Sequence, residues 1–80
     1  MAQTSAAEQQ ARQRLATNVR RLRTERGVSA QDAAEKIGMH WRHWQKIETA
    51  EVGATLGTLT RLATALGVDV VDLLSRPPTR

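Results

Sequence analysis

Apolar residues recur at every third or fourth position through most of the chain, with polar residues between them. The first stripe consists of Leu15, Val19 and Leu22, and similar stripes follow as far as Leu74. This spacing places about one apolar residue per turn on the same face of an α-helix, so each stripe predicts an amphipathic helix. The pattern predicts an all-α fold of five helices without strands.

Helix-capping residues and glycines indicate where these helices begin and end. The predicted elements run from about Arg14 to Gly27, from Ser29 to Gly38, from His40 to about Thr49, from Thr55 or Thr58 to Gly67, and from Asp69 to just before Pro77-Pro78. Residues 14–75 thus form one domain, followed by a tail at 76–80. Residues 1–13 are predicted to be a flexible arm, although their polar, Ala- and Gln-rich part could instead extend the first helix.

The stretch from Ser29 to Glu48 predicts two short helices that cross over a tight turn. Ala34 is small where the second helix must approach, and Gly38 can adopt the left-handed conformation that such a turn requires. Four apolar side chains can hold the pair on a shared core: Ile37, Met39, Trp44 and Ile47. This arrangement is a helix-turn-helix, whose second helix lies in the major groove of DNA.

Length and composition exclude several other classes of protein. Eighty residues make one domain, too small to build an enzymatic cleft easily, and the absence of cysteine excludes disulfides and thiolate metal sites. No apolar run is long enough to span a membrane, and no signal peptide precedes the first stripe. We therefore expect a cytoplasmic protein that binds no membrane and needs no cofactor.

The net charge of +4 is unevenly distributed along the chain. Residues 12–46 carry nine Arg or Lys against three Asp or Glu, a net charge of +6, whereas residues 47–80 carry a net charge of −1. A basic N-terminal half suits a protein that presents one side to a polyanion, although it could also serve only solubility.

Both aromatic residues are tryptophans of the predicted third helix, three positions apart. Trp44 is in register with Ile47 and is expected in the core. Trp41 belongs to the first turn, on the edge that would enter a groove. It could extend the core or make an apolar contact with a thymine methyl or a sugar.

Residues spread from Leu15 to Leu74 follow the pattern of a known family. They are Val19-Arg20-Arg21-Leu22-Arg23, Gly27-Val28-Ser29, Ala34, Gly38, Trp44, Ile47-Glu48, Leu59, Leu62-Ala63, Leu66-Gly67-Val68 and Leu73-Leu74. This pattern resembles the Cro/C1-type (XRE-like) helix-turn-helix family of phage repressors and small bacterial transcription regulators. The resemblance implies a lambda-repressor-like DNA-binding domain and a sequence-specific transcriptional regulator, which we expect to be a repressor on the nucleoid.

The resemblance also implies roles for individual residues. Arg23 and Glu48 match a pair that ties the first helix to the end of the recognition helix. The positions from which the family reads bases are held here by His40, Trp41, Arg42, Gln45 and Lys46. Arg42 suits a bidentate contact to guanine and Gln45 a contact to adenine, whereas Lys46 could reach a base or a phosphate.

The chain departs from the family pattern where phosphates are usually bound. Ala30 replaces the glutamine that opens the second helix, and the loop after the third helix carries Glu51 but no positive charge. Ala50 stands where the family often has glycine. The remaining candidates for phosphate contacts are Arg12, Arg14, Arg20, Arg21 and Gln31.

The end of the chain predicts a contact between two copies. The short fifth helix has more apolar residues than its own docking requires, and we expect a symmetric homodimer through Val70, Val71, Leu73 and Leu74. His40 and His43 have a spacing that can suit a metal, but no carboxylate or thiol ligand accompanies them, so we predict no metal site.

The leading hypothesis is therefore a dimeric regulator that binds double-stranded DNA and is not an enzyme. Glu48 and Glu51 do not form a convincing acid/base pair, because nothing in the sequence positions a substrate beside them. The alternative is a protein-binding helix-turn-helix module, such as an antitoxin or an adaptor, with Trp41 as its interface anchor.

Overall fold

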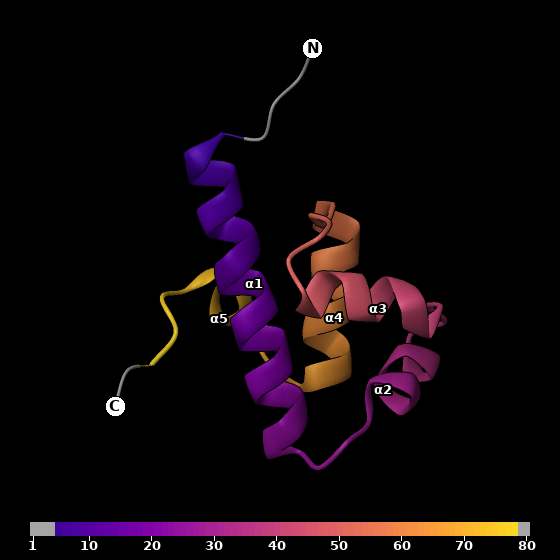
Figure 1. The fold of residues 1–80 in the computed structure, drawn as a ribbon. Coiled ribbons are helices and arrows are strands. Elements are labelled where there is room, and N and C mark those ends of the chain that lie inside the picture. Colours follow the sequence, from indigo (N-terminus) through magenta and orange to yellow (C-terminus); the bar gives the residue numbers. More distant parts are fainter. Residues whose placement is uncertain (1–4, 79–80) are drawn as a thin grey trace.

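The computed structural model describes residues 5–78, and every regular element within that range is an α-helix (Figure 1). The helices are α1 (Ala6–Glu25), α2 (Ala30–Lys36), α3 (Trp41–Glu48), α4 (Leu56–Leu66) and α5 (Val70–Leu74). This confirms the predicted five-helix, all-α fold. Residues 1–4 of the predicted arm and residues 79–80 of the predicted tail lie outside the described range.

Helix α1 begins at Ala6 rather than near Arg14, so residues 6–13 form the helical extension that the sequence left open as the alternative to an arm. The side chain of Ser5 accepts a hydrogen bond from the backbone N–H of Glu8, and Glu8 pairs with Arg12 one turn later. The apolar pattern missed this extension because its first turns are exposed on all sides. Capping and local charge, rather than burial, stabilise the extension.

The other helices begin where the sequence predicted. The N-caps are Ser29 for α2, His40 for α3, Thr55 rather than Thr58 for α4, and Asp69 for α5, where Asp72 completes a capping box. At the end of α3, Ala50 is the one described non-glycine residue with a positive φ, 62°. A Cβ in this conformation costs roughly 1–2 kcal/mol, which is why glycine is common there.

The long helix α1 packs against α3, α4 and α5 (Figure 1), and the core lies between these helices. Five apolar side chains from these four helices have no exposed surface: Val19, Trp44, Ile47, Leu62 and Leu73. Burying each such side chain contributes about 1.5–3 kcal/mol, so this cluster supplies much of the stability of so small a domain. Trp44 is in the core as predicted.

One buried residue of the core is polar. Asn18 of α1 is 1% exposed, and its side-chain amide donates hydrogen bonds to the backbone carbonyls of Leu73 (3.0 Å) and Ser75 (2.8 Å). Its own side-chain oxygen accepts from Arg21. Asn18 thereby satisfies carbonyls at the C-terminal end of α5 that no further helical turn could satisfy.

Candidate nucleic-acid interface

Helices α2 and α3 are joined by the tight turn that the sequence predicted. Gly38 has a φ of +64°, and the backbone N–H of Met39 reaches back to the carbonyl of Ala34 at 2.9 Å. Arg61 of α4 donates a hydrogen bond to the carbonyl of Ile37, at the end of α2. The turn is therefore fixed by its own backbone and by α4, which gives α3 a defined angle to α2.

The outer face of α3 carries the residues predicted to read bases. His40, Trp41, Arg42, Gln45 and Lys46 are all exposed. At about 100° per residue, the four of them that lie within the helix span an arc of roughly 140° on the side opposite Trp44 and Ile47. Together with the N-cap His40, they are called the outer face of α3. A helix of this length with one polar face is compatible with the width of the major groove.

The first turn of α3 is held by contacts among neighbouring side chains. The Nδ1 atom of His40 accepts a hydrogen bond from the backbone N–H of Arg42 at 3.1 Å, so His40 caps the helix. The rings of His40 and Trp41 stack with centroids 6.1 Å apart, and the guanidinium carbon of Arg42 lies 5.6 Å from the centroid of the Trp41 ring. Trp41 itself is 38% exposed and does not extend the core.

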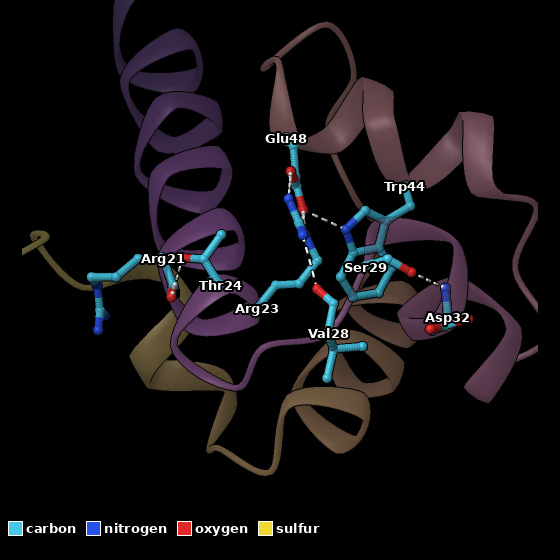
Figure 2. A network of polar contacts seen from close by, with 8 residues as sticks. All are labelled: Arg21, Arg23, Thr24, Val28, Ser29, Asp32, Trp44 and Glu48. Atoms are coloured by element: carbon cyan, nitrogen blue, oxygen red, sulfur yellow. Dashed lines mark hydrogen bonds and ion pairs between the residues drawn. The ribbon is translucent and has the colours of Figure 1, made fainter.

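Behind this face, Arg23 and Glu48 form a bidentate ion pair, as the resemblance implied (Figure 2). The Nε and Nη2 atoms of Arg23 donate to the two carboxylate oxygens at 2.6 and 3.0 Å, and the indole N–H of Trp44 donates to the same carboxylate at 2.6 Å. The third nitrogen of Arg23 donates to the carbonyl of Val28 at 2.9 Å. One arginine thus joins α1, the segment before α2, and α3.

This network also governs the charge at the end of α3. The hydrogen bond to Glu48 is the main cause that raises the pKa of Arg23 above its usual value, and it outweighs the desolvation that would lower it. The guanidinium is therefore permanently charged and neutralises Glu48. The outer face of α3 then presents the cations Arg42 and Lys46 and no carboxylate of its own.

The residues predicted to contact phosphates do not share one surface. Arg21 points away from α3, on the side of α1 opposite Arg23 (Figure 2), and is paired with Glu25. Arg14 is seven positions earlier and therefore lies on nearly the same side of the helix, where it lines a depression with Arg76 and Pro77. The structure therefore does not bring Arg14 and Arg21 together with the outer face of α3.

Among the other predicted phosphate contacts, Arg12 reaches toward the end of α3. Arg12 lies almost in line with Arg23 along α1, since the two are eleven positions apart, and its side chain reaches the loop after α3. A Cβ added at Gly53 would lie 3.5 Å from Arg12 Nε. Arg12 thus brings a positive charge to the loop that lacks one of its own, although it is paired there with Glu8. Arg20 and Gln31 are exposed.

The residues predicted to form a dimer contact are split between the core and the surface. Leu73 is fully buried against the other helices of its own chain, which corrects the prediction that it meets a second copy. Val70 is half-buried and also packs against the core. Val71 and Leu74 remain on the surface, at 68% and 38% exposed.

Sequence reasoning did not predict the surroundings of three residues outside α3, namely Leu56, Asn18 and Arg61. Leu56 at the start of α4 is 74% exposed, although it continues the apolar spacing of Leu59, Leu62 and Leu66. Asn18 and Arg61 bond backbone carbonyls from distant parts of the chain. A polar residue at an otherwise apolar position of a stripe was the only available signal for Asn18.

Residues 5–78 contain neither a metal-binding cluster nor a membrane-spanning helix. No group of three or more His, Asp or Glu side chains there could hold a metal ion, and His40 and His43 lie without a carboxylate partner. None of the helices in this range is long and apolar enough to cross a membrane.

Comparisons with known proteins cover nearly the whole of this fold. Residues 14–75 match the helix-turn-helix domain family. Control protein C.SmaI of Serratia marcescens is 40% identical over 62 residues, which span 78% of this chain and 74% of the relative. The crystal structure of NHTF, a hypothetical transcription factor from Neisseria, is similar with a TM-score of 0.82 and 30% identity, over 96% of this chain and 87% of that one.

Proposed function

This chain belongs to the Cro/C1-type (XRE-like) family of helix-turn-helix transcriptional regulators, and on that premise we propose that it is a repressor. It binds a specific, two-fold symmetric site on double-stranded DNA as a homodimer. The observation that carries this proposal is the outer face of α3. Its side chains are exposed and include cations and an amide, and the nearest carboxylate of the helix, Glu48, is paired with Arg23. Such a protein works in the cytoplasm, on the nucleoid, and represses by occupying the duplex.

The proposal assigns each side chain of the outer face a role in the major groove. Arg42 makes a bidentate contact to guanine O6 and N7, and Gln45 pairs with the edge of an adenine. The indole edge of Trp41 meets a thymine methyl or a sugar at the groove wall. His40 and Lys46 lie at the two ends of the face, where they reach a base or the adjacent phosphates.

Affinity comes largely from contacts with DNA phosphates. Fewer residues make these contacts than the sequence predicted. Arg12, Arg20 and Gln31 are assigned to this set because they are exposed or reach the loop after α3. Arg14 and Arg21 are left out because they lie on the far side of α1. The N-terminal backbone amides of α2 and α3 add further donors for phosphate oxygens.

The dimer contact is assigned to the exposed apolar residues of α5 and α4. Val71 and Leu74 are three positions apart and so share a face of α5. Leu74 lines a groove with Ala54 and Leu59, near the N-terminus of α4, where Leu56 is the first residue. Contiguous exposed apolar side chains mark interfaces more often than scattered ones do, and Val71 and Leu74 form such a pair on α5. To engage two half-sites one turn of DNA apart, such a dimer has to hold its two α3 helices about 34 Å apart.

The proposal is tested by selecting binding sites from a randomised duplex library with the purified protein. We expect an enriched inverted repeat, whose half-site spacing reports the dimer geometry. A single enriched half-site would retain DNA recognition and exclude the dimer. No enrichment at low salt would contradict DNA recognition and favour the protein-binding alternative, with Trp41 as the first residue to substitute.

A further inference from the structure

The first turn of α3 contains a contact that the roles assigned above do not require. The guanidinium of Arg42 lies 5.6 Å from the ring centroid of Trp41, within the range of a cation–π interaction. The ring of His40 stacks on the same indole with an interplanar angle of 22°. His40 also accepts the backbone N–H of Arg42. Three consecutive exposed residues are therefore joined by ring, charge and backbone contacts.

An isolated arginine on a helix surface samples many rotamers, and a base contact must restrict them. A neighbouring aromatic face restricts them beforehand, because the guanidinium gains by staying over the ring. No carboxylate holds Arg42: the three ion pairs among the described residues are Arg12–Glu8, Arg21–Glu25 and Arg23–Glu48. Trp41 is thus the group that orders this arginine while leaving its donors free for a ligand.

The exposure of Trp41 fits this role better than a role in folding. Trp44, three positions later, is fully buried and hydrogen-bonded to Glu48, whereas Trp41 is absent from the core cluster. The indole of Trp41 therefore remains part of the outer face of α3, and the groups that contact its ring are His40 and Arg42.

We propose that Trp41 is a positioning residue for Arg42, and that it sets the base preference at the pair that Arg42 reads. This inference rests on the proposed function, since it concerns the same face of α3. It goes beyond that function by making the discrimination of one base pair depend on a side chain that need not touch that pair. The ligand class is a guanine edge in the major groove, the partner that a pre-oriented guanidinium fits best.

The free protein gives the first test. In the wild-type protein, the indole ring current should shift the Arg42 δ-protons upfield in the NMR spectrum, and Trp41→Leu should abolish that shift. Trp41→Phe retains a ring and should preserve part of it. Because Trp44 remains in every variant, its fluorescence reports whether the core is intact. Arg42 δ-protons at the usual position in the wild-type protein would overturn the proposal.

The second test is a double-mutant cycle on the duplex recovered from the library, compared with the same duplex substituted at each base pair in turn. Arg42→Ala should lower discrimination at one guanine by on the order of tenfold or more. Trp41→Leu should lower discrimination at that same pair several-fold, and it should have no further effect there once Arg42 is alanine. Gln45→Ala serves as the matched control, because its effect should add to that of Trp41→Leu.

The outcomes separate this inference from the function on which it rests. If Trp41→Leu alters discrimination only at a different base pair of the recovered duplex, the positioning role is overturned and the proposed function remains intact. The same holds if the effect of Trp41→Leu adds fully to that of Arg42→Ala. Failure of the wild-type protein to enrich any duplex overturns both.

Discussion

Arg42 and Lys46 are both exposed cations of α3, but the roles proposed for them predict different effects on DNA binding. Arg42→Ala should weaken binding of the selected duplex by about 1–3 kcal/mol and relax the preference at one base pair. Lys46→Ala should instead weaken binding to all duplexes alike if it contacts a phosphate. Titrations of the selected duplex and its single-base variants distinguish the two. Unchanged selectivity in Arg42→Ala would contradict its assignment.

Among the basic residues of α1, position on the helix predicts which ones contribute to affinity. Arg20→Ala should reduce the slope of log Kobs against log salt by about 1, because one phosphate contact is lost. Arg14→Ala removes the same charge from the far side of α1 and should leave that slope nearly unchanged. Equal effects of the two variants would mean that net charge, rather than a defined surface, determines binding.

The buried amide of Asn18 has a structural consequence that its exposed neighbour lacks. Asn18→Ala removes two hydrogen bonds to carbonyls at the end of α5 and should lower the free energy of unfolding by about 1–3 kcal/mol. Thr17→Ala, one position earlier and exposed, should change it by less than about 0.5 kcal/mol. Urea denaturation measures both, and equal small changes would show that water replaces Asn18 at these carbonyls.

At the scale of single residues, the sequence predicted which side chains are exposed better than what they touch. Helical spacing was enough to place Trp44 in the core and Arg42 on the outer face. It could not predict that Arg42 lies over Trp41, because this contact depends on side-chain rotamers. Nor could it find Asn18, whose partners lie more than fifty positions away.

The orientation of α3 depends on the network around Glu48. Glu48→Ala leaves Arg23 more than four-fifths buried without its carboxylate and should lower the free energy of unfolding by about 3 kcal/mol. Glu25→Ala breaks an exposed ion pair of α1 and should cost less than about 1 kcal/mol. Thermal or urea denaturation provides the comparison. If both variants lost equally little free energy of unfolding, the network around Glu48 would not be the main contact between α3 and α1.

At the scale of elements, caps were more reliable than apolar periodicity. Ser29, His40 and Asp69 each marked a helix start correctly, because the cap satisfies backbone N–H groups locally. Periodicity failed for the first turns of α1, where no side chain is buried. It also failed to separate Leu73 from Leu74, since a helix of five residues has too few turns to define its buried side.

For the whole molecule, the division of the α5 side chains between core and surface limits how two copies could meet. Leu73 anchors α5 inside the chain, so its substitution would unfold the domain and could not test association. Val71 is mostly exposed, and a charge there disturbs a dimer without disturbing the core. The useful variant is therefore Val71→Asp, and Gln13→Asp adds the same charge to an exposed site on α1.

If the copies associate through α5, sedimentation equilibrium should show a dimer for the wild-type protein and a monomer for Val71→Asp, with Gln13→Asp remaining dimeric. The same variant should bind the inverted repeat more weakly by about 100-fold or more, because two half-sites are no longer engaged by one linked pair. Its affinity for a single half-site should not change, since the outer face of α3 is intact. A wild-type protein that stays monomeric at high concentration and still binds the repeat tightly would place the contact between copies elsewhere, or on DNA alone.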